Sequence, residues 1–173
     1  MKKFICLGLF LATIPVANWM IGNVGVICVP KGPCLIPVAP GLMAPSGVLL
    51  VGIALVLRDA VHEYFGPVVA AAAILVGAAL SAFVAPTPLV VASGLAFLLS
   101  ELADMAVYTP LRRRRLVLAV MASGVVGAFV DSLVFLYIAF GSLDYLSGQV
   151  VGKLWMTIAA AIWLWRRRFD RSA

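Results

Sequence analysis

The residues from Leu116 to Phe140 read LVLAVMASGVVGAFVDSLVFLYIAF, and Asp131 is the only charged residue among them. A transmembrane helix needs about 20 consecutive, mostly apolar residues, so this stretch is long enough to cross a bilayer. Four arginines, at positions 112–115, come directly before it. Because basic clusters gather on the cytoplasmic side of membrane proteins, the stretch predicts a transmembrane helix that begins on that side.

The rest of the chain has the same character on both sides of this span. Hydrophobic residues make up 64% of the 173-residue sequence and charged residues only 12%, a balance that excludes a soluble globular domain. The net charge of +6 comes from clusters at the ends of apolar runs, which argues against nucleic-acid binding. We predict an all-α membrane protein, a single six-transmembrane-helix bundle over residues 1–173. The expected helices cover about 4–21, 46–59, 68–84, 89–108, 116–140 and 149–165.

The basic residues also predict the orientation of the bundle. When Lys and Arg are counted in alternate loops, nearly all of them fall on one side, which also holds both ends of the chain. By the positive-inside rule both termini are then cytoplasmic. A cleaved signal peptide is the alternative interpretation of the first apolar run, from Phe4 to Ile21, because Lys2 and Lys3 precede it.

Glycine and proline interrupt the segment 22–45 at irregular spacing, which fits neither a helical nor a strand period. We interpret this segment as an apolar external loop that either folds over the bundle as a lid or inserts partly into it. Cys28 and Cys34 lie within the loop and form a disulfide if it faces an oxidising compartment, or stay free thiols if it does not. No histidine lies near them, so no metal site is expected.

Several ionisable residues are predicted at membrane depth, where a charge is costly unless it is paired or faces water. Glu101 and Asp104 are three residues apart and share a face of their helix, which must point into the bundle. Arg58, followed by Asp59, ends another span on the same side and is placed to pair with one of them. The trio of Arg58, Glu101 and Asp104 is either a buried ion-pair network that fixes the packing, or an inner gate or proton-linked network.

A second polar group is predicted closer to the outer side. Asp131 and Lys153 are expected at depths that differ by less than about 10 Å at ~1.5 Å per residue, so a salt bridge is one interpretation. The other is that Asp131, with Gln149 and Asn18, lines an outward-facing cavity that binds a polar ring. A carboxylate that accepts two parallel N–H bonds matches an amidine-like edge such as that of guanine. Trp155 is the candidate stacking surface for such a ring.

Catalytic signatures are absent from the sequence. It contains no His-Glu-x-x-His, Gly-x-Ser-x-Gly or Walker motif and no Cys–His pairing. We therefore expect neither an enzyme nor a bound cofactor. A small membrane enzyme or an assembly factor stays open as an alternative function.

Four segments carry a resemblance to a known family: Gly41–Asp59, Ser100–Arg112, Gly127–Gly141 and Gly148–Lys153. In their order and spacing they resemble the small six-helix transporters of the vitamin uptake type, better described as queuosine-precursor transporters. The resemblance implies uptake of a 7-deazaguanine precursor across the bacterial inner membrane without an attached ATPase. The implied fold is similar to that of the substrate-binding subunits of energy-coupling-factor transporters.

The resemblance also implies which residues form the site, because they lie in the matching segments. These residues are Arg58, Asp59, Glu101, Asp104, Asp131, Ser132, Gln149 and Lys153. We expect a secondary carrier in which Asp131, Gln149 and Lys153 recognise a guanine-like ring. The alternative is a subunit that docks on an energising complex, but such subunits carry an Ala-x-x-x-Ala patch on the first helix, and here Val16 follows Ala12. The coupling ion, the choice among purine-like precursors and the oligomeric state, including a homo-oligomer, stay open.

Overall fold

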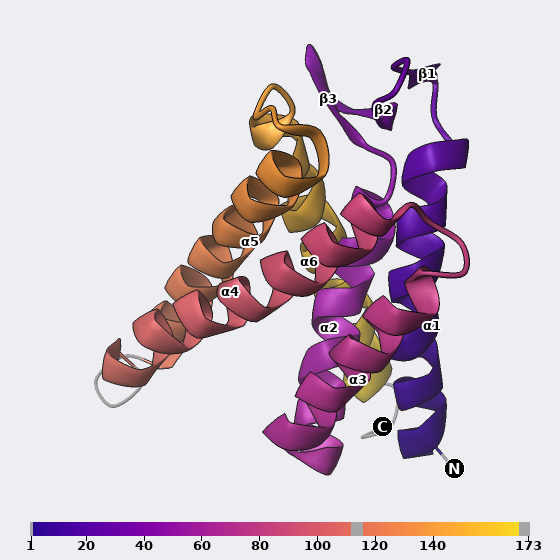
Figure 1. Cartoon of the computed structure of the whole chain (residues 1–173). Coiled ribbons are helices and arrows are strands. Elements are labelled where there is room, and N and C mark those ends of the chain that lie inside the picture. The colour runs from indigo at the N-terminus through magenta and orange to yellow at the C-terminus, as the bar shows by residue number, and fades with distance from the viewer. Residues whose placement is uncertain (1, 112–115, 170–173) are drawn as a thin grey trace.

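The computed structural model describes residues 2–111 and 116–169. These residues form six α-helices and one three-stranded antiparallel sheet (Figure 1). The expected number of helices is thus confirmed. The arginines at 112–115 and Arg171, on which the predicted orientation partly rests, lie outside the described residues. The helices are α1 (Lys2–Asn23), α2 (Val48–Phe65), α3 (Pro67–Ser81), α4 (Thr87–Leu111), α5 (Leu116–Phe140) and α6 (Leu146–Phe169).

Not every helix is equally suited to cross a bilayer. Within the described residues, three helices are long and apolar enough to do so, at Lys3–Asn23, Thr87–Leu111 and Met121–Phe140. The helix α3 is apolar but has only 15 residues, about 22 Å at ~1.5 Å per residue, against a hydrocarbon core of ~30 Å. The chain is therefore a multi-pass membrane protein, with three candidate spans of full length among the residues that the structure describes and further helices that are shorter or more polar.

The helices pack in two groups. The helices α1, α2 and α3 pack on one another, and α6 packs on α2, whereas α4 packs mainly on α5. Figure 1 shows α4 and α5 side by side and leaning away from the other helices toward their connection. Phe10 of α1 and Phe97 of α4 lie 6.3 Å apart between ring centroids in the core that joins the groups.

The helix α2 is longer than predicted. The expected helix over 46–59 continues through His62 to Phe65, and the chain turns at Gly66. That glycine has φ +85°, a conformation that glycine adopts readily because it has no Cβ atom. Pro67 then starts α3, since its fixed φ suits the first helical position.

The prediction of an irregular loop over 22–45 is wrong in part. Strands β1 (Ile27–Cys28), β2 (Cys34–Ala39) and β3 (Leu42–Pro45) form an antiparallel sheet in the order β1-β2-β3. The hairpin between β2 and β3 turns at Gly41, with φ +74°, a conformation that suits a tight hairpin connection. The prolines at 37 and 45 hid the strands, because proline inside a run argues against a strand.

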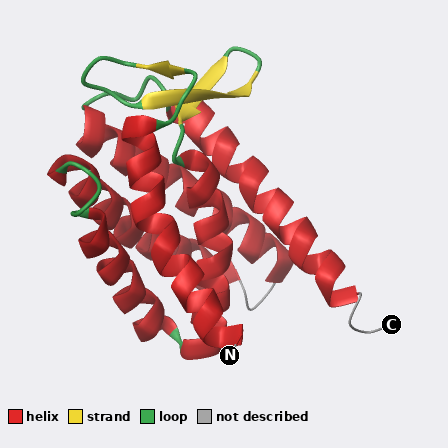
Figure 2. Cartoon of the chain, turned by 90° about the vertical axis from the view of Figure 1, so that its right-hand side faces the viewer, coloured by secondary structure: helices red, strands yellow, loops and turns green. Residues whose placement is uncertain are grey.

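The sheet lies over the end of the bundle opposite to the start of α1 (Figure 2), an end that we name the sheet end. The strands β2 and β3 contact α6, and β2 contacts α1. Where β3 leads into α2, the Ser46 hydroxyl donates a 2.8 Å hydrogen bond to the Met20 carbonyl of α1. The sheet is therefore attached to two helices at this end of the bundle.

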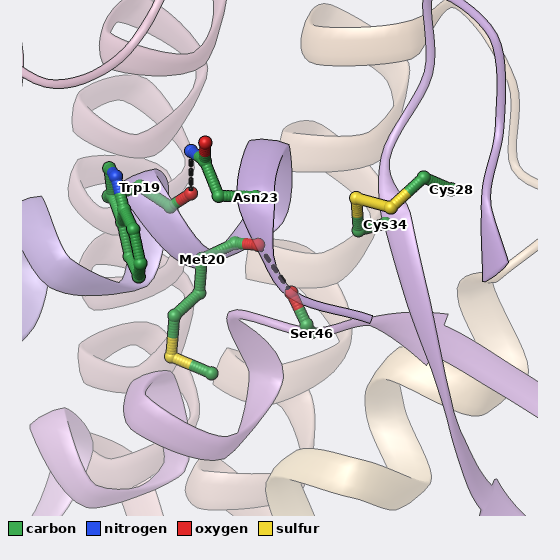
Figure 3. The surroundings of a disulfide bond; sticks show 6 residues. All are labelled: Trp19, Met20, Asn23, Cys28, Cys34 and Ser46. Atoms are coloured by element: carbon green, nitrogen blue, oxygen red, sulfur yellow. Dashed lines mark hydrogen bonds between the residues drawn. A yellow bond between two sulfur atoms is a disulfide. The ribbon is translucent and has the colours of Figure 1, made fainter. Parts of the chain in front are cut away.

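A disulfide joins the two cysteines of this segment. Cys28 and Cys34 are paired residues of β1 and β2 and form the bond seen in Figure 3. Of the two alternatives that the sequence left open, the structure therefore has the disulfide. Cys6, in α1, is a free thiol.

Reduction of this disulfide should lower the thermal stability of the purified protein. The bond closes a short loop, with a sequence separation of 6, for which chain entropy predicts a contribution of about 2 kcal/mol. For a chain of this size we expect a fall of about 4–8 °C in the unfolding midpoint in detergent. A Cys28→Ser/Cys34→Ser variant should be insensitive to reductant, whereas Cys6→Ser should keep the response. An equal midpoint with and without reductant in the unchanged protein would contradict the prediction.

Candidate functional site

A cavity lies inside the bundle, with α1, α4, α5 and α6 each contributing polar residues to its lining. Its interior has a volume of about 50 Å³, several times the ~10–15 Å³ that one water needs and well below the ~300 Å³ of small ligand pockets. In this conformation the cavity has room for a few waters. A bicyclic ring would fit only after the surrounding helices move apart. The polar lining residues are Thr13, Asn18, Ser93, Asp131 and Gln149.

Asp131 forms an ion pair at the edge of this cavity. Its Oδ2 atom accepts a hydrogen bond from Nζ of Lys153 on α6. The same ammonium group donates a 2.8 Å bond to Oγ of Ser132, and that hydroxyl donates in turn to the Ala128 carbonyl at 2.7 Å. Lys153 is 0% exposed and does not line the cavity, whereas Asp131 does. The predicted salt bridge and the predicted cavity position of Asp131 are thus both present.

Asp131 and Lys153 lie at similar depths in the bundle because of their positions along α5 and α6. Asp131 lies nine residues before the end of α5 at Phe140, and Lys153 lies seven residues after the start of α6 at Leu146. At ~1.5 Å per residue both side chains start about 10–14 Å below the sheet end. The helix α6 begins three residues earlier than expected, which brings the two depths closer than the sequence predicted.

Two amide side chains in the cavity have polar atoms without a protein partner. Nδ2 of Asn18 and Oε1 of Gln149 are buried and form no hydrogen bond with any residue that the structure describes, and both residues are 3% exposed. The Ser93 hydroxyl donates a 2.7 Å bond to Oδ1 of Asn18, which holds that amide in place. A buried polar atom without a partner is costly. One free donor and one free acceptor in the same cavity therefore indicate a place for a polar ligand or water.

The apolar part of the lining includes two phenyl rings. Phe97 of α4 and Phe135 of α5 both face the cavity. Each is held by a second ring: Phe97 packs against Phe10, and Phe135 against Phe140 with centroids 5.9 Å apart. Aromatic faces favour stacking with flat rings. The cavity thus combines polar groups for one edge of a ligand with apolar rings for its faces.

An ion pair lies on the other side of Phe97, toward the end where α1 begins. Arg58 of α2 pairs with Glu101 of α4, and its guanidinium lies 5.8 Å from the centroid of the Phe97 ring, within the range of a cation–π contact. The pair that the sequence allowed for Arg58 is therefore formed. Phe97 separates this pair from the cavity.

The two acidic residues of α4 have different neighbours, although they share a helix face. Glu101 contacts α2 through Arg58. Asp104 instead lies next to α5, where a Cβ atom placed on Gly127 would be 3.6 Å from its own Cβ. The predicted trio is thus an Arg58–Glu101 pair with Asp104 apart from it. The side chain of Asp59 lies outside the described part of the chain.

The structure places Trp155 away from the cavity. It is 59% exposed and borders a shallow apolar groove with Val38 and Leu49 on the outside of the bundle. The prediction that Trp155 stacks on a ring beside Asp131 is therefore wrong for this conformation. The aromatic rings that line the cavity are instead those of Phe97 and Phe135.

Sequence reasoning missed Ser93, Phe97 and Phe135, and the helical period could have found them. Residues four and eight positions before Glu101 lie on the same face of α4, and these are Phe97 and Ser93. By the same spacing Phe135 follows Asp131 on α5. Because the helix faces that carry Glu101 and Asp131 were already assigned to the bundle interior, the same spacing also predicts that Ser93, Phe97 and Phe135 face inward.

Comparison with known proteins gives one match. A family model described as "Putative vitamin uptake transporter" matches residues 81–167, just over half of the chain. The matched region contains α4, α5 and most of α6, and with them Ser93, Glu101, Asp131, Gln149 and Lys153. Comparisons with curated proteins and with solved structures gave no match. The chain therefore belongs to the vitamin uptake transporter family and is a membrane protein of transporter type.

Proposed function

We propose that this protein is a secondary carrier that imports a 7-deazaguanine precursor of queuosine and binds it in the cavity beside Asp131. The observation that carries the proposal is the set of polar groups there. Asn18 offers a free donor, while Gln149 and the second carboxylate oxygen of Asp131 offer acceptors. A guanine-type edge presents the complement, with one carbonyl acceptor and two N–H donors. Phe97 and Phe135 supply apolar faces for the ring.

The proposal includes an inner gate at the Arg58–Glu101 pair. Phe97 lies between the cavity and this pair, so separation of Arg58 from Glu101 would release the ring that closes the cavity on that side. Asp104 lies one turn further along α4, near enough to take part when the pair opens. Coupling to protons would use these carboxylates.

The orientation is part of the same proposal. We place both termini in the cytoplasm and the sheet end outside, in the bacterial inner membrane. The disulfide at the sheet end supports this placement, since structural disulfides persist in oxidising compartments and rarely in the cytosol. The basic residues of the sequence point to the same orientation. A bundle similar to the substrate-binding subunits of energy-coupling-factor transporters, working without an ATPase, completes the proposal.

An uptake assay tests the proposal. Cells that lack their own carrier would express the protein and receive labelled 7-deazaguanine precursor, and binding to the purified protein would be measured in parallel. Gln149→Ala should reduce both binding and uptake by about tenfold or more, because it removes a buried hydrogen bond to the ring. Glu101→Gln should keep binding but slow uptake, because it alters the gate and leaves the cavity lining intact. Trp155→Phe, outside the cavity, serves as the control with unchanged uptake.

Several results would count against this function. If cells expressing the unchanged protein take up no more precursor than cells without it, the carrier proposal fails. If Gln149→Ala and Glu101→Gln both transport at the full rate, the roles assigned to the cavity and the gate fail. Uptake that depends on co-expressed ATPase subunits would favour the energy-coupling-factor alternative.

A further inference from the structure

We propose that the site selects rings without net charge, and that Lys153 sets this preference from outside the cavity. The inference rests on the proposed function, because it concerns the ligand of the same site. It adds the charge class of the substrate, which neither the family nor the hydrogen-bonding groups of the cavity define.

The first step is the charge balance of the cavity. Among the described residues that line it, Asp131 carries the one formal charge. Lys153 donates to that carboxylate, is 0% exposed and has its second hydrogen bond to Ser132 rather than to the cavity. The negative charge is therefore matched by a buried cation that does not itself line the cavity. Arg58 and Glu101 balance each other beyond the Phe97 ring.

The second step is the cost of bringing a charge into such a place. An ion that leaves water loses its hydration, and a buried site regains that free energy only with an opposite charge and matching hydrogen bonds. This cavity has no uncompensated charge among its described lining residues. An ammonium or a carboxylate on the ligand would therefore enter at a loss, whereas a neutral ring meets the free amide groups of Asn18 and Gln149.

The third step assigns the role of Lys153. Without its ammonium group, the Asp131 carboxylate would be an uncompensated anion in the same cavity. The site would then gain from a ligand that brings a positive charge of its own. Lys153 is thus a positioning residue: it holds Asp131 through Oδ2, leaves the other oxygen to the ring, and removes the reason to bind a cation.

The test compares three 7-deazaguanines that differ only at the end of the arm on C7: a neutral group, an ammonium or a carboxylate. Binding of each to the purified full chain in detergent would be measured by titration. The unchanged protein should bind the neutral ring at least about tenfold more tightly than either charged ring. In Lys153→Gln, which removes the positive charge and keeps an N–H donor, the ammonium ring should become the preferred ligand. Lys153→Arg should keep the original order, because it keeps the charge.

A second variant covers the case in which Lys153→Gln does not fold. Asn18→Asp adds a carboxylate of nearly the same shape to the cavity and leaves Lys153 in place, so it should also shift the preference toward the ammonium ring. If the unchanged protein binds none of the three rings, the proposed function itself fails. If it binds the ammonium ring as tightly as the neutral one, or if folded Lys153→Gln or Asn18→Asp keeps the original order, the charge selection is overturned while the carrier proposal stands.

Discussion

Replacing Asp131 alone by Leu should lower the free energy of unfolding by about 3–5 kcal/mol, the usual effect of removing one partner from a buried ion pair. The change would leave the ammonium group of Lys153, which is 0% exposed, with the Ser132 hydroxyl as its one remaining partner among the described residues. The cost arises from the cation that stays behind, rather than from the lost attraction between the two charges.

For that reason, replacing both partners should undo the damage. Apolar residues of similar volume in place of a whole buried ion pair often leave a protein as stable as before, or up to about 4 kcal/mol more stable. An Asp131→Leu/Lys153→Met variant should therefore unfold near the temperature of the unchanged protein. It should still fail to take up precursor, because the carboxylate that faces the cavity is gone.

Thermal unfolding in detergent and uptake in cells, measured on the same variants, check both expectations. Asp144→Leu is the matched control, since Asp144 is an exposed carboxylate in the connection that follows α5, where a substitution usually changes stability by less than about 0.5 kcal/mol. A stable Asp131→Leu single variant would show that Lys153 is not confined to a dry interior. Full uptake by the double variant would remove Asp131 from the binding site.

Replacing Gly148 by Ala should also have a large effect, with the opposite sign from the same change at Gly124. A Cβ atom at Gly148 would collide with the Met43 carbonyl and approach the backbone nitrogen of Ala44 to 3.4 Å. Backbone atoms cannot move aside as the end of a side chain can, so the sheet would be pushed away from α6. Overpacking of this kind costs about 1–3 kcal/mol.

Gly124→Ala is the matched control for that change. It places the same methyl group on α5, where the new Cβ comes within 4 Å of no heavy atom of the described residues outside the local turns of its own helix. A Gly-to-Ala change inside a helix gains up to about 1 kcal/mol. Unfolding midpoints of the two variants should therefore lie on opposite sides of that of the unchanged protein. Limited proteolysis within 24–45 should be faster in Gly148→Ala only. Equal midpoints for the two variants would mean that the sheet does not rest on α6 as described.

Hydrophobicity predicted the helices well because a chain in lipid must satisfy its backbone hydrogen bonds internally, which a helix does. A long apolar run in the sequence therefore predicts a helix directly. The stretch around Asp131 was read correctly as one helix for this reason. The sheet was missed because its prolines break the alternation by which strands are recognised, and because its pairing depends on contacts with α6 and α1 that no local pattern contains. The end of α2 was placed too early because the charged residues after Arg58 were left out of the apolar span, although they continue the helix to Phe65.

The candidate site was predictable only as far as depth and helix faces reach. Depth along the helices was enough to suggest that Asp131 meets Lys153. It could not decide which neighbour Glu101 and Asp104 each contact, because that depends on how α4 crosses α2 and α5. The position of Trp155 depended on the rotation of α6 about its axis, which Gln149 and Lys153 fix by pointing inward; Trp155, two residues after Lys153, then points outward.

The contact at Gly148 links two parts of the molecule mechanically. Gly148, which packs against the backbone of β3, comes directly before Gln149, whose amide we assign to the ring. Both residues belong to the first turns of α6. Movement of the strands away from α6 would allow the first turns of this helix to shift. The same shift would weaken the binding of a ligand at Gln149. Opening of the sheet end and release of the ligand would thus occur in one movement, and no separate signal would be needed to couple them.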